Sequence, residues 1–378
     1  MSSEHSDFRG AVRRMAAAHV GPIADAIDRG DAIPSGLVDT FADMGLVQLP
    51  VPVEYGGPGG DVMSAVIARE EIAAAGSMAA AQLANQNGTL AGAVARHGSD
   101  VLKAELLPDL ATGRHLTAIC MTEPEAGSDP SRMTTRAVRD AGDWVIDGLK
   151  SFISWGSQAD FALVFARTSE AESGGGIGAF VVDTADQGWK VERVNDMMGA
   201  RGVPNCDIRL DGLRVPARRM VGDQDGGFAA AMDAVQRNRP VVAAASVGCA
   251  VAAMSYAAEY ARERYQSGRP IAQFQGIRWK LADMATRTEA ARRLVYASAE
   301  AFDAGASRAE TGRLASMAKL VASETAVDVT REAVQILGGH GYLRDHPVER
   351  YVRDAILGTL YEGTSEIQRN IIAKAVLP

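Results

Sequence analysis

Near the C-terminus, one carboxylate has the surroundings that a general base requires. Glu362 follows Tyr361 and precedes Gly363 in the string Tyr-Glu-Gly-Thr, and Leu357 and Leu360 come shortly before it. A carboxylate in a dry, apolar site is less stable as an anion, so its pKa rises and it becomes a better base. The alternative is an exposed glutamate at a helix start, which would only favour the helix dipole. The apolar neighbours favour the first interpretation.

A second candidate is a turn rich in glycine and hydroxyl side chains. The string Cys120-Met-Thr-Glu-Pro-Glu-Ala-Gly-Ser-Asp129 follows an apolar stretch typical of a strand. Pro124, Gly127 and Ser128 make it a turn with exposed backbone N–H groups and hydroxyls, which suit a phosphate or the polar edge of a flavin. Taken alone, the string could equally be an ordinary strand-to-loop turn.

Two further strings combine glycine with arginine or glutamine. Gln335-Ile-Leu-Gly-Gly-His-Gly-Tyr342 ends one long helical stretch, and Arg264-Tyr-Gln-Ser-Gly-Arg-Pro-Ile-Ala-Gln-Phe-Gln275 interrupts another. An arginine fork can hold a diphosphate through two parallel charge-assisted bonds, and paired glycines let backbone approach it closely. Arg262 and Arg269 add positive charge where a phosphorylated small molecule could bind. Each string alone could be a plain helix end.

Composition excludes several classes of protein. The 378-residue chain has a formal net charge of -8 and a pI near 5.4, whereas nonspecific nucleic-acid binding needs a basic face. Cys120, Cys206 and Cys249 lie far apart, which predicts free thiols and a reducing cytoplasm. No metal-binding spacing of His and Cys is present, so we expect no metal. The N-terminus has no signal-peptide pattern, and no apolar run approaches the ~20 residues that cross a bilayer, so we expect no membrane insertion.

The spacing of apolar residues changes twice along the chain, which predicts an α+β protein of three domains. Residues 1–114 are rich in alanine with helical spacing and predict an N-terminal helical domain. Residues 115–222 contain short apolar runs bounded by Gly, Ser and Asp, which predict a central antiparallel β-barrel or sandwich. Residues 223–378 return to helical spacing and predict a C-terminal four-helix bundle that self-associates.

Two local features give sharper expectations. The apolar positions within residues 61–96 fall largely on one helical face, which predicts an amphipathic helix. Residues 144–149 alternate between apolar and polar across Asp147-Gly148, which predicts a hairpin turn at that dipeptide.

Together and in this order, the three strings resemble the acyl-CoA dehydrogenase family. The resemblance covers essentially the whole chain, including the Glu54-Tyr-Gly-Gly turn in the first domain. It implies an FAD-dependent enzyme that introduces a double bond next to the carbonyl of an acyl thioester. It also implies that FAD lies extended between the β-domain and the C-terminal helices, with a second subunit of a homodimer or homotetramer closing over its ADP end. The implied partners are an acyl-CoA or acyl-carrier-protein substrate and an electron-transfer flavoprotein or similar acceptor.

The resemblance also implies roles for individual residues. Glu362 would take the α-proton as hydride leaves the β-carbon for flavin N5. The implied substrate contacts are Ser128, Arg239, Tyr361 and Gly363. The implied cofactor contacts are Met121, Thr122, Gly127, Ser128, Phe152, Ile153, Ser154, Arg264, Gln275, Gln335, Ile336, Leu337, Gly338, Gly339, Thr364 and Glu366. Among these, Arg264, Gln275 and the backbone of residues 335–339 would serve the pyrophosphate of the neighbouring subunit's FAD, and Thr364 and Glu366 the adenosine half.

Some positions depart from the family pattern. Gln236 stands where many relatives have an acid three residues before an arginine, which weakens the inference about the CoA site, and Trp155 follows Ser154 where Asn or Ser is usual. Residues 266–268 read Gln-Ser-Gly where the family has a Phe before the glycine. Gln86 and Asn87, on a helix expected around residues 82–90, predict an acyl pocket too polar for a long alkyl chain.

Other functions remain open on this fold. Relatives include flavin oxidases, hydroxylases and thioester desulfinases, but those that abandon dehydrogenation often lose the base, which is present here as Glu362. A non-enzymatic scaffold that keeps FAD as a structural part is a further alternative. A nicotinamide enzyme is disfavoured, because Pro58 interrupts the glycine string of residues 56–60 and no GxGxxG between a strand and a helix follows.

Overall fold

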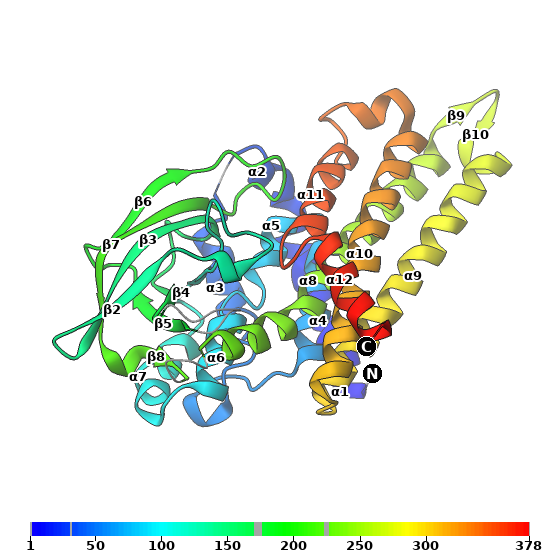
Figure 1. The fold of residues 1–378 in the computed structure, drawn as a ribbon. Helices are drawn as coiled ribbons and strands as arrows, with labels where there is room; N and C mark the ends of the chain where they lie inside the picture. The colour runs from blue at the N-terminus through cyan, green and yellow to red at the C-terminus, as the bar shows by residue number, and fades with distance from the viewer. Residues whose placement is uncertain (1, 31, 170–175, 223–226, 378) are drawn as a thin grey trace.

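The computed structural model describes residues 2–30, 32–169, 176–222 and 227–377, and its chain passes from helices to a sheet and back to helices (Figure 1). This order confirms the predicted α+β class. The expected boundary between residues 222 and 223 falls at residues 223–226, which lie outside the described part of the chain.

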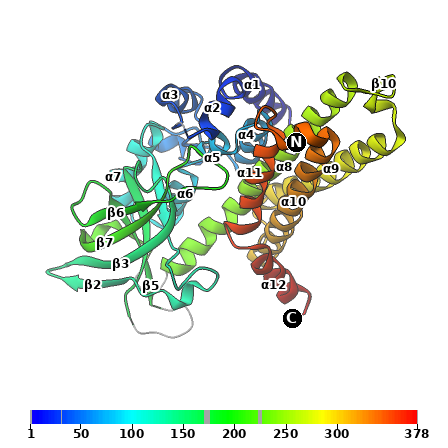
Figure 2. The same ribbon diagram turned by 90° about the horizontal axis from the view of Figure 1, so that it is seen from above.

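Short helices form the N-terminal region. They are α1 (Ser3–His19), η1 (Gly21–Ile23), α2 (Ala24–Asp28), α3 (Ser35–Asp43), η2 (Val53–Tyr55), α4 (Val62–Ala74), α5 (Met78–Leu83), α6 (Gly88–His97) and α7 (Asp100–Ala111). Helix α4 lies beside α1, α5 and α8 (Gly227–Glu263) (Figure 2). The amphipathic helix expected within residues 61–96 needs correction, because three helices, α4, α5 and α6, occupy that stretch. The first of them, α4, is buried from residue 65 to residue 73 on all sides, including its charged positions. Its apolar residues therefore predicted burial but not a solvent-facing side.

One eight-stranded sheet forms the middle of the chain. Its strands are β1 (Thr117–Cys120), β2 (Arg136–Asp140), β3 (Asp143–Ser154), β4 (Phe161–Arg167), β5 (Ile177–Asp183), β6 (Trp189–Val194), β7 (Asn205–Val215) and β8 (Met220–Val221). The order is β6-β7-β3-β2-β4-β5-β8, with β1 beside β4. Most pairs are antiparallel as predicted, but β1 and β4 pair in parallel, as do β2 and β4 at one position, so the sheet is mixed.

The predicted hairpin exists but turns at a different place. β2 and β3 pair from Asp140 and Asp143, and the turn between them holds Ala141 and Gly142 at positive φ, the conformation of a tight hairpin turn. At Asp147-Gly148 the strand continues through a bulge. A Cβ on Gly148 would lie 2.3 Å from the Thr135 hydroxyl, so the glycine there serves close packing rather than a turn.

Long helices form the C-terminal region. They are α8 (Gly227–Glu263), α9 (Gln275–Asp303), α10 (Arg308–Leu337), α11 (Val348–Leu360) and α12 (Ser365–Val376), with η5 (Ile271–Gln273), η6 (Gly338–Tyr342) and the small hairpin β9 (Tyr265–Gln266) and β10 (Arg269–Pro270) between them. α8, α9, α10 and α11 pack together as the predicted four-helix bundle, and α4 packs along α8. One apolar core runs through α1, α4, α5 and the bundle, while the sheet has its own core.

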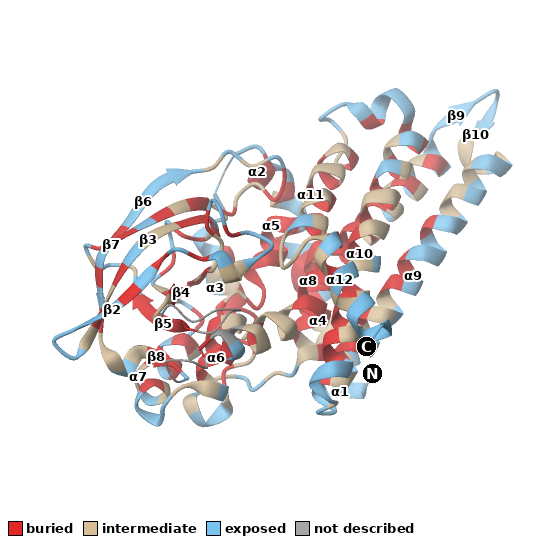
Figure 3. Ribbon diagram, viewed as in Figure 1, coloured by how far each residue is buried: buried red, intermediate tan, exposed pale blue. Residues whose placement is uncertain are grey.

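The expectation that no apolar run approaches membrane length needs correction. Within α8, Met232–Glu263 is long and apolar enough to cross a bilayer by length and composition, with a mean hydropathy of 1.8 over 18 residues. Most of that window is buried inside the protein, where α8 contacts α4 and α10. Figure 3 shows the buried interior of α8 and α4 between more exposed outer elements. The helix is thus apolar because it forms the centre of the core.

Candidate active site

Glu362 lies in the short connection between α11 and α12. Its φ is +54° and that of Gly363 is +90°, so the chain turns sharply through the left-handed region at both residues. Strain of this kind persists only where the surroundings hold it, and it concentrates at functional sites. Lys319 of α10 holds the turn by donating from Nζ to the Gly363 carbonyl at 2.7 Å, and Gln368 of α12 donates to the same oxygen at 2.8 Å.

The carboxylate of Glu362 receives a hydrogen bond from α8. Asn238 donates from Nδ2 to Oε1 at 3.0 Å. Burial raises the pKa of Glu362, while the hydrogen bond from Asn238 and the charges of Arg239, Arg69 and Lys319 oppose the rise. The result is a carboxylate that is more basic than an ordinary glutamate yet kept in place by a neutral donor. The apolar neighbours expected from the sequence do not account for this, since Leu360 is 56% exposed and the groups that act on the carboxylate are polar or charged.

The positive charges near Glu362 are themselves buried. Arg239 and Arg69 are 6% and 5% exposed, and Lys319 is 1% exposed. Burial lowers the pKa of all three side chains, that of Lys319 to about 8, and the charge of Glu362 opposes this. Nε and Nη1 of Arg239 and Nε of Arg69 have no hydrogen-bond partner. A guanidinium stays charged in proteins, so these donors are available to a ligand.

Arg239 precedes a proline inside α8, at a point where the continuous helix lacks one backbone hydrogen bond. Pro240 has no N–H and cannot close the helical hydrogen bond to the Gln236 carbonyl. Arg239 and Asn238 lie on this turn and face the Glu362 carboxylate. The side chain of Gln236 lies instead against Gly312 of α10, so the departure at Gln236 does not alter the surroundings of the base.

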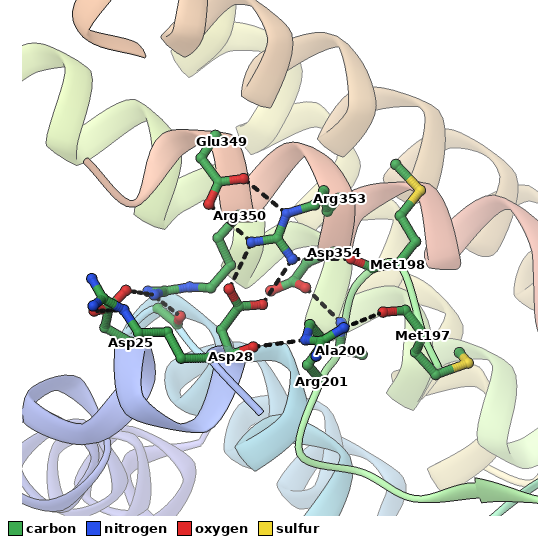
Figure 4. A network of polar contacts seen from close by, with 12 residues as sticks. Asp25, Asp28, Met197, Met198, Ala200, Arg201, Glu349, Arg350, Arg353 and Asp354 are labelled. Atoms are coloured by element: carbon green, nitrogen blue, oxygen red, sulfur yellow. Dashed lines mark hydrogen bonds and ion pairs between the residues drawn. The ribbon is translucent and has the colours of Figure 1, made fainter. Parts of the chain in front are cut away.

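A network of ion pairs joins α11, which carries the Glu362 turn, to the rest of the protein (Figure 4). Arg353 donates from both Nη atoms to the two carboxylate oxygens of Asp28 in α2, at 2.8 and 2.6 Å, and also pairs with Glu349. Arg350 pairs with Asp25 and donates to the Gly76 carbonyl. These contacts tie α11 to the N-terminal helices.

The same network reaches the β-domain. Asp354 accepts a hydrogen bond from the Ala200 N–H at 2.6 Å, and Arg201 donates to the Asp28 carbonyl at 2.8 Å (Figure 4). Asp354 is deeply buried, and burial raises its pKa to about 6. All three regions of the chain thus meet at α11, which fixes the start of the Glu362 turn.

The predicted flavin segments of the β-domain lie side by side. The Ser151 N–H donates to the Thr122 carbonyl at 2.9 Å, so the turn after β1 runs along the end of β3, which carries Phe152, Ile153 and Ser154. Met121 and Thr122 are half-buried, whereas Gly127 and Ser128 are exposed. The structure therefore places the motif Met-Thr-Glu-Pro next to Phe-Ile-Ser.

The turn after β1 is held in place by the ion pair of Glu123 and Lys150. Lys150 donates from Nζ to Glu123 at 2.8 Å and to the Met121 carbonyl at 3.2 Å, and Glu123 also accepts from the Thr134 and Thr135 N–H groups. Both side chains are almost fully buried. The charge and hydrogen bonds of Lys150 outweigh burial and hold the pKa of Glu123 at about 2. Lys150 is thus a support of the turn that the motif did not reveal.

Phe152 and Ile153 point in opposite senses. Phe152 has a φ of +60° and is 67% exposed, which leaves a flat aromatic face on the surface next to the Thr122 turn. Ile153 is buried in the core of the sheet, so only its backbone could meet a cofactor. An exposed aromatic ring held in a strained conformation is typical of a ligand-contacting position.

The remaining predicted cofactor residues gather at two other places. Arg264 and Gln275 are exposed on either side of the hairpin at the end of α8, and Gln335, Gly338 and Gly339 are exposed at the end of α10. Tilted and edge-to-face ring contacts bring these ends together, since the ring centroid of Tyr260 lies 6.0 Å from that of His340 and 5.8 Å from that of His346. Ile336 and Leu337 are buried core residues, so only their backbone remains for a ligand.

Thr364 and Glu366 have structural tasks of their own. The Thr364 hydroxyl accepts from the Ile367 N–H and caps α12, and Glu366 lies exposed in the first turn of that helix. The predicted site residues thus form three groups: the Glu362 turn with Arg239, the β-domain edge, and the exposed end of the bundle. Within the described residues, no group of His, Cys, Asp or Glu could hold a metal ion.

The reasoning that predicted a polar acyl pocket does not hold, because the residues on which it rested have other positions and partners. Residues 84–87 lie between α5 and α6 rather than on a helix around 82–90. Gln86 donates to the Thr117 carbonyl at 2.6 Å and Asn87 to the His115 carbonyl at 2.7 Å, so both amides join the N-terminal region to the sheet. Asn238, Lys319 and Arg69 were missed, because residues that meet across three helices share no sequence spacing.

The features of this chain fit FAD. Open space lies where a Cβ would be at Gly127, Gly338 and Gly339, so backbone there can approach a ligand closely. The exposed Phe152 ring directly follows Ser151, whose N–H bonds the Thr122 carbonyl, and this combination of an open ring and nearby polar backbone suits a flat ring with a polar edge. The exposed guanidinium of Arg264 suits a diphosphate.

Comparison with known proteins gives a consistent result over the whole chain. The family models for the acyl-CoA dehydrogenase N-terminal, middle and C-terminal domains match residues 2–114, 118–213 and 225–377. An acyl-CoA dehydrogenase of Bacillus subtilis is 39% identical over 377 residues, covering 100% of this chain and 99% of the relative. Butyryl-CoA dehydrogenase from Megasphaera elsdenii superposes with a TM-score of 0.96 at 34% identity, covering 100% of this chain and 99% of that one. A chain from a structural study of the electron transferring flavoprotein of Acidaminococcus fermentans superposes with a TM-score of 0.95 at 34% identity, covering 100% of this chain and 98% of that one.

Proposed function

The chain belongs to the acyl-CoA dehydrogenase family, and from that premise we propose that Glu362 is the base that begins α,β-dehydrogenation of an acyl thioester bound beside FAD. The family consists of FAD-binding oxidoreductases that act on acyl-CoA. The proposed product is the 2-enoyl thioester. The acyl group can be carried by CoA or by an acyl carrier protein, since both present the same pantetheine arm.

The observation that carries the proposal is the carboxylate of Glu362, a half-buried residue that accepts a hydrogen bond from Asn238. An α-proton of a thioester is weakly acidic, so a basic group must be held against it without competing water. Burial raises the pKa of Glu362, and Asn238 at 3.0 Å orients its carboxylate. Glu362 takes the α-proton, and bound FAD supplies the acceptor for the β-hydride.

The turn around Glu362 also offers a donor to the thioester carbonyl. Among the described residues, the Glu362 N–H reaches no acceptor, because the extended ψ of Tyr361, 165°, turns it away from the helical ladder. As the α-proton leaves, negative charge builds on the carbonyl oxygen, and a preorganised backbone N–H stabilises it. Lys319 and Gln368 keep this N–H in place by holding the Gly363 carbonyl.

We propose the remaining cofactor and substrate roles from the family resemblance and from where these residues lie. We assign the flavin ring to Met121, Thr122, Phe152, Ile153 and Ser154, with Gly127 and Ser128 at the open edge where substrate enters. Arg239, Tyr361 and Gly363 line the substrate side of the base. Arg264, Gln275, residues 335–339, Thr364 and Glu366 serve the ADP end.

A homo-oligomer completes the site in this proposal. Large apolar side chains are exposed at the end of the bundle, where Tyr342 is 87%, Trp279 62% and Tyr265 61% exposed. These surround the exposed Arg264 and Gly338, and apolar exposure on this scale marks an interaction surface. A dimer or tetramer would cover it and bring Arg264 to the partner's FAD. An electron-transfer flavoprotein is the proposed acceptor, and the cytoplasm the proposed location.

An anaerobic reaction with a panel of acyl thioesters tests the proposal. The purified protein should be yellow with about one FAD per chain, and at least one CoA or carrier-protein thioester should bleach the flavin and yield the 2-enoyl product. Rapid oxygen consumption by the reduced protein without an added acceptor would point to the oxidase alternative. Release of FMN, or of no flavin after incubation with FAD, would refute the proposal.

A further inference from the structure

The buried helix α4 carries one charged residue that has no protein partner. Its three consecutive charged residues, Arg69, Glu70 and Glu71, are all buried. Glu70 accepts from Arg292 at 2.7 Å and from the Tyr296 hydroxyl. Glu71 pairs with Arg13 through two hydrogen bonds, at 2.8 and 3.0 Å. Both glutamates are therefore neutralised by other helices, and neither is left for Arg69.

Arg69 itself lies within electrostatic range of the candidate active site. It is 5% exposed, its Nε is enclosed without a partner, and no hydrogen bond or ion pair joins it to another described residue. The groups that act on its charge are Tyr361 and Glu362. The guanidinium thus lies within electrostatic reach of the base, and the carboxylate of Glu362 takes its hydrogen bond from Asn238 rather than from Arg69.

An unpaired buried guanidinium is unfavourable, since a buried charge needs an opposite charge or several hydrogen bonds to offset desolvation. The best complement to its planar fork is a carboxylate, which can accept two parallel hydrogen bonds. No described residue fills that role. A ligand that binds next to Glu362 could fill it if its acyl chain ended in an anionic group.

We propose that Arg69 is a specificity-determining residue that selects an acyl chain ending in a carboxylate, that is, a dicarboxylyl thioester. The inference rests on the proposed function, because the α-carbon must lie at Glu362 for the far end of the chain to reach Arg69. Arg69 and Arg239 then contact different parts of the substrate. Arg239 on α8 follows Asn238, which holds the base, so we assign it to the reacting end of the substrate. Arg69 on α4 receives the distal carboxylate and disfavours an uncharged chain, which would leave the guanidinium unpaired.

Two thioesters of equal chain length test this proposal. Glutaryl-CoA carries a distal carboxylate, whereas pentanoyl-CoA has a methyl group in its place. The measurement is the anaerobic rate of flavin bleaching at low substrate concentration for the parent and for Arg69→Met. The parent should prefer glutaryl-CoA. Losing one partner of a buried, hydrogen-bonded charge pair should lower the rate with glutaryl-CoA by roughly 30- to 5,000-fold. The rate with pentanoyl-CoA should change much less, because it reports only the effect of Arg69 on the basicity of Glu362.

Two further variants complete the design. Arg69→Lys keeps the charge but loses the fork, so its rate with glutaryl-CoA should lie between those of the parent and Arg69→Met. This variant carries the test if Arg69→Met does not fold. Arg293→Met is the matched control, because Arg293 is exposed on α9 and pairs with Glu289 within its own helix. It should match the parent with both thioesters.

The outcomes separate this inference from the proposed function. Equal losses with both thioesters would show that Arg69 only positions Glu362, and loss of flavin would show that it serves the cofactor; either result overturns the inference. A parent bleached equally well by both chains overturns it too, while dehydrogenation stands. A yellow parent bleached by neither of these thioesters nor by any other in the panel contradicts the proposed function itself.

Discussion

Replacing Asn238 by leucine should change the pH at which the enzyme gains activity. The side-chain amide donates to Glu362 at 3.0 Å and opposes the rise in its pKa. A hydrogen bond to a charged group contributes about 1.5–3 kcal/mol, and 1.36 kcal/mol corresponds to one pKa unit. Asn238→Leu should therefore raise the pKa of Glu362 by about 1–2 units further. Because the base acts as the carboxylate, the rate should fall at a correspondingly higher pH.

The assay is anaerobic flavin bleaching by an acyl thioester, with kcat/KM followed against pH so that the free enzyme is reported. The acid limb of the Asn238→Leu profile should move up by about 1–2 pH units, and the rate well above it should be retained. Gln236→Leu is the matched control, since Gln236 lies two residues away on α8 against Gly312. An acid limb at the parent pH would show that Asn238 does not set the basicity of the base.

Three other substitutions test the buried Glu123–Lys150 pair and the proposed FAD contact of Arg264. Lys150→Met leaves Glu123 buried without its cation and should cost about 3–5 kcal/mol of the free energy of unfolding, measured by urea denaturation; loss below 1 kcal/mol would contradict the pairing. The pKa of Glu123 is held at about 2 against an ordinary 4.5, so the stability it contributes is present above pH 4.5 and lost as pH falls through 2, a loss that Glu123→Gln should remove. Arg264→Ala should lose FAD on gel filtration while keeping the parent circular dichroism spectrum, and full retention of FAD would refute its assignment to the diphosphate.

The sequence predicted well the features that depend on local pattern. The long alanine-rich stretches became α8, α9 and α10, and the breaks at residues 268–270 and 338–341 fall between helices. The apolar run at 161–166 became β4. These succeed because a long period of 3.6 residues, or a short apolar run between turn residues, is visible without knowledge of the fold.

The features that failed depend on contacts across the fold. Gly148 looked like a turn residue, but Thr135, which comes just before β2, packs against it. Gln86 was expected to line the acyl pocket, yet its side-chain amide donates a hydrogen bond to the Thr117 carbonyl of the sheet. Arg69 precedes two glutamates in the sequence, and only the folded structure shows that arginines of other helices form hydrogen bonds with both of them. No spacing rule reveals which partner a buried polar group finds.

The central claim, that Glu362 is the base, is tested most directly by Glu362→Gln. The amide keeps the size of the side chain and can still contact Asn238, but it cannot accept the α-proton. FAD content should match the parent, and so should that of Glu324→Gln, a control whose carboxylate pairs with Arg369 on the outside of α10. A positioned general base contributes roughly 10²–10⁴-fold, so bleaching by the acyl thioester and exchange of its α-proton with solvent deuterium should both fall by at least about two decades. Bleaching and exchange at the parent rate in a flavin-loaded Glu362→Gln protein would contradict the account.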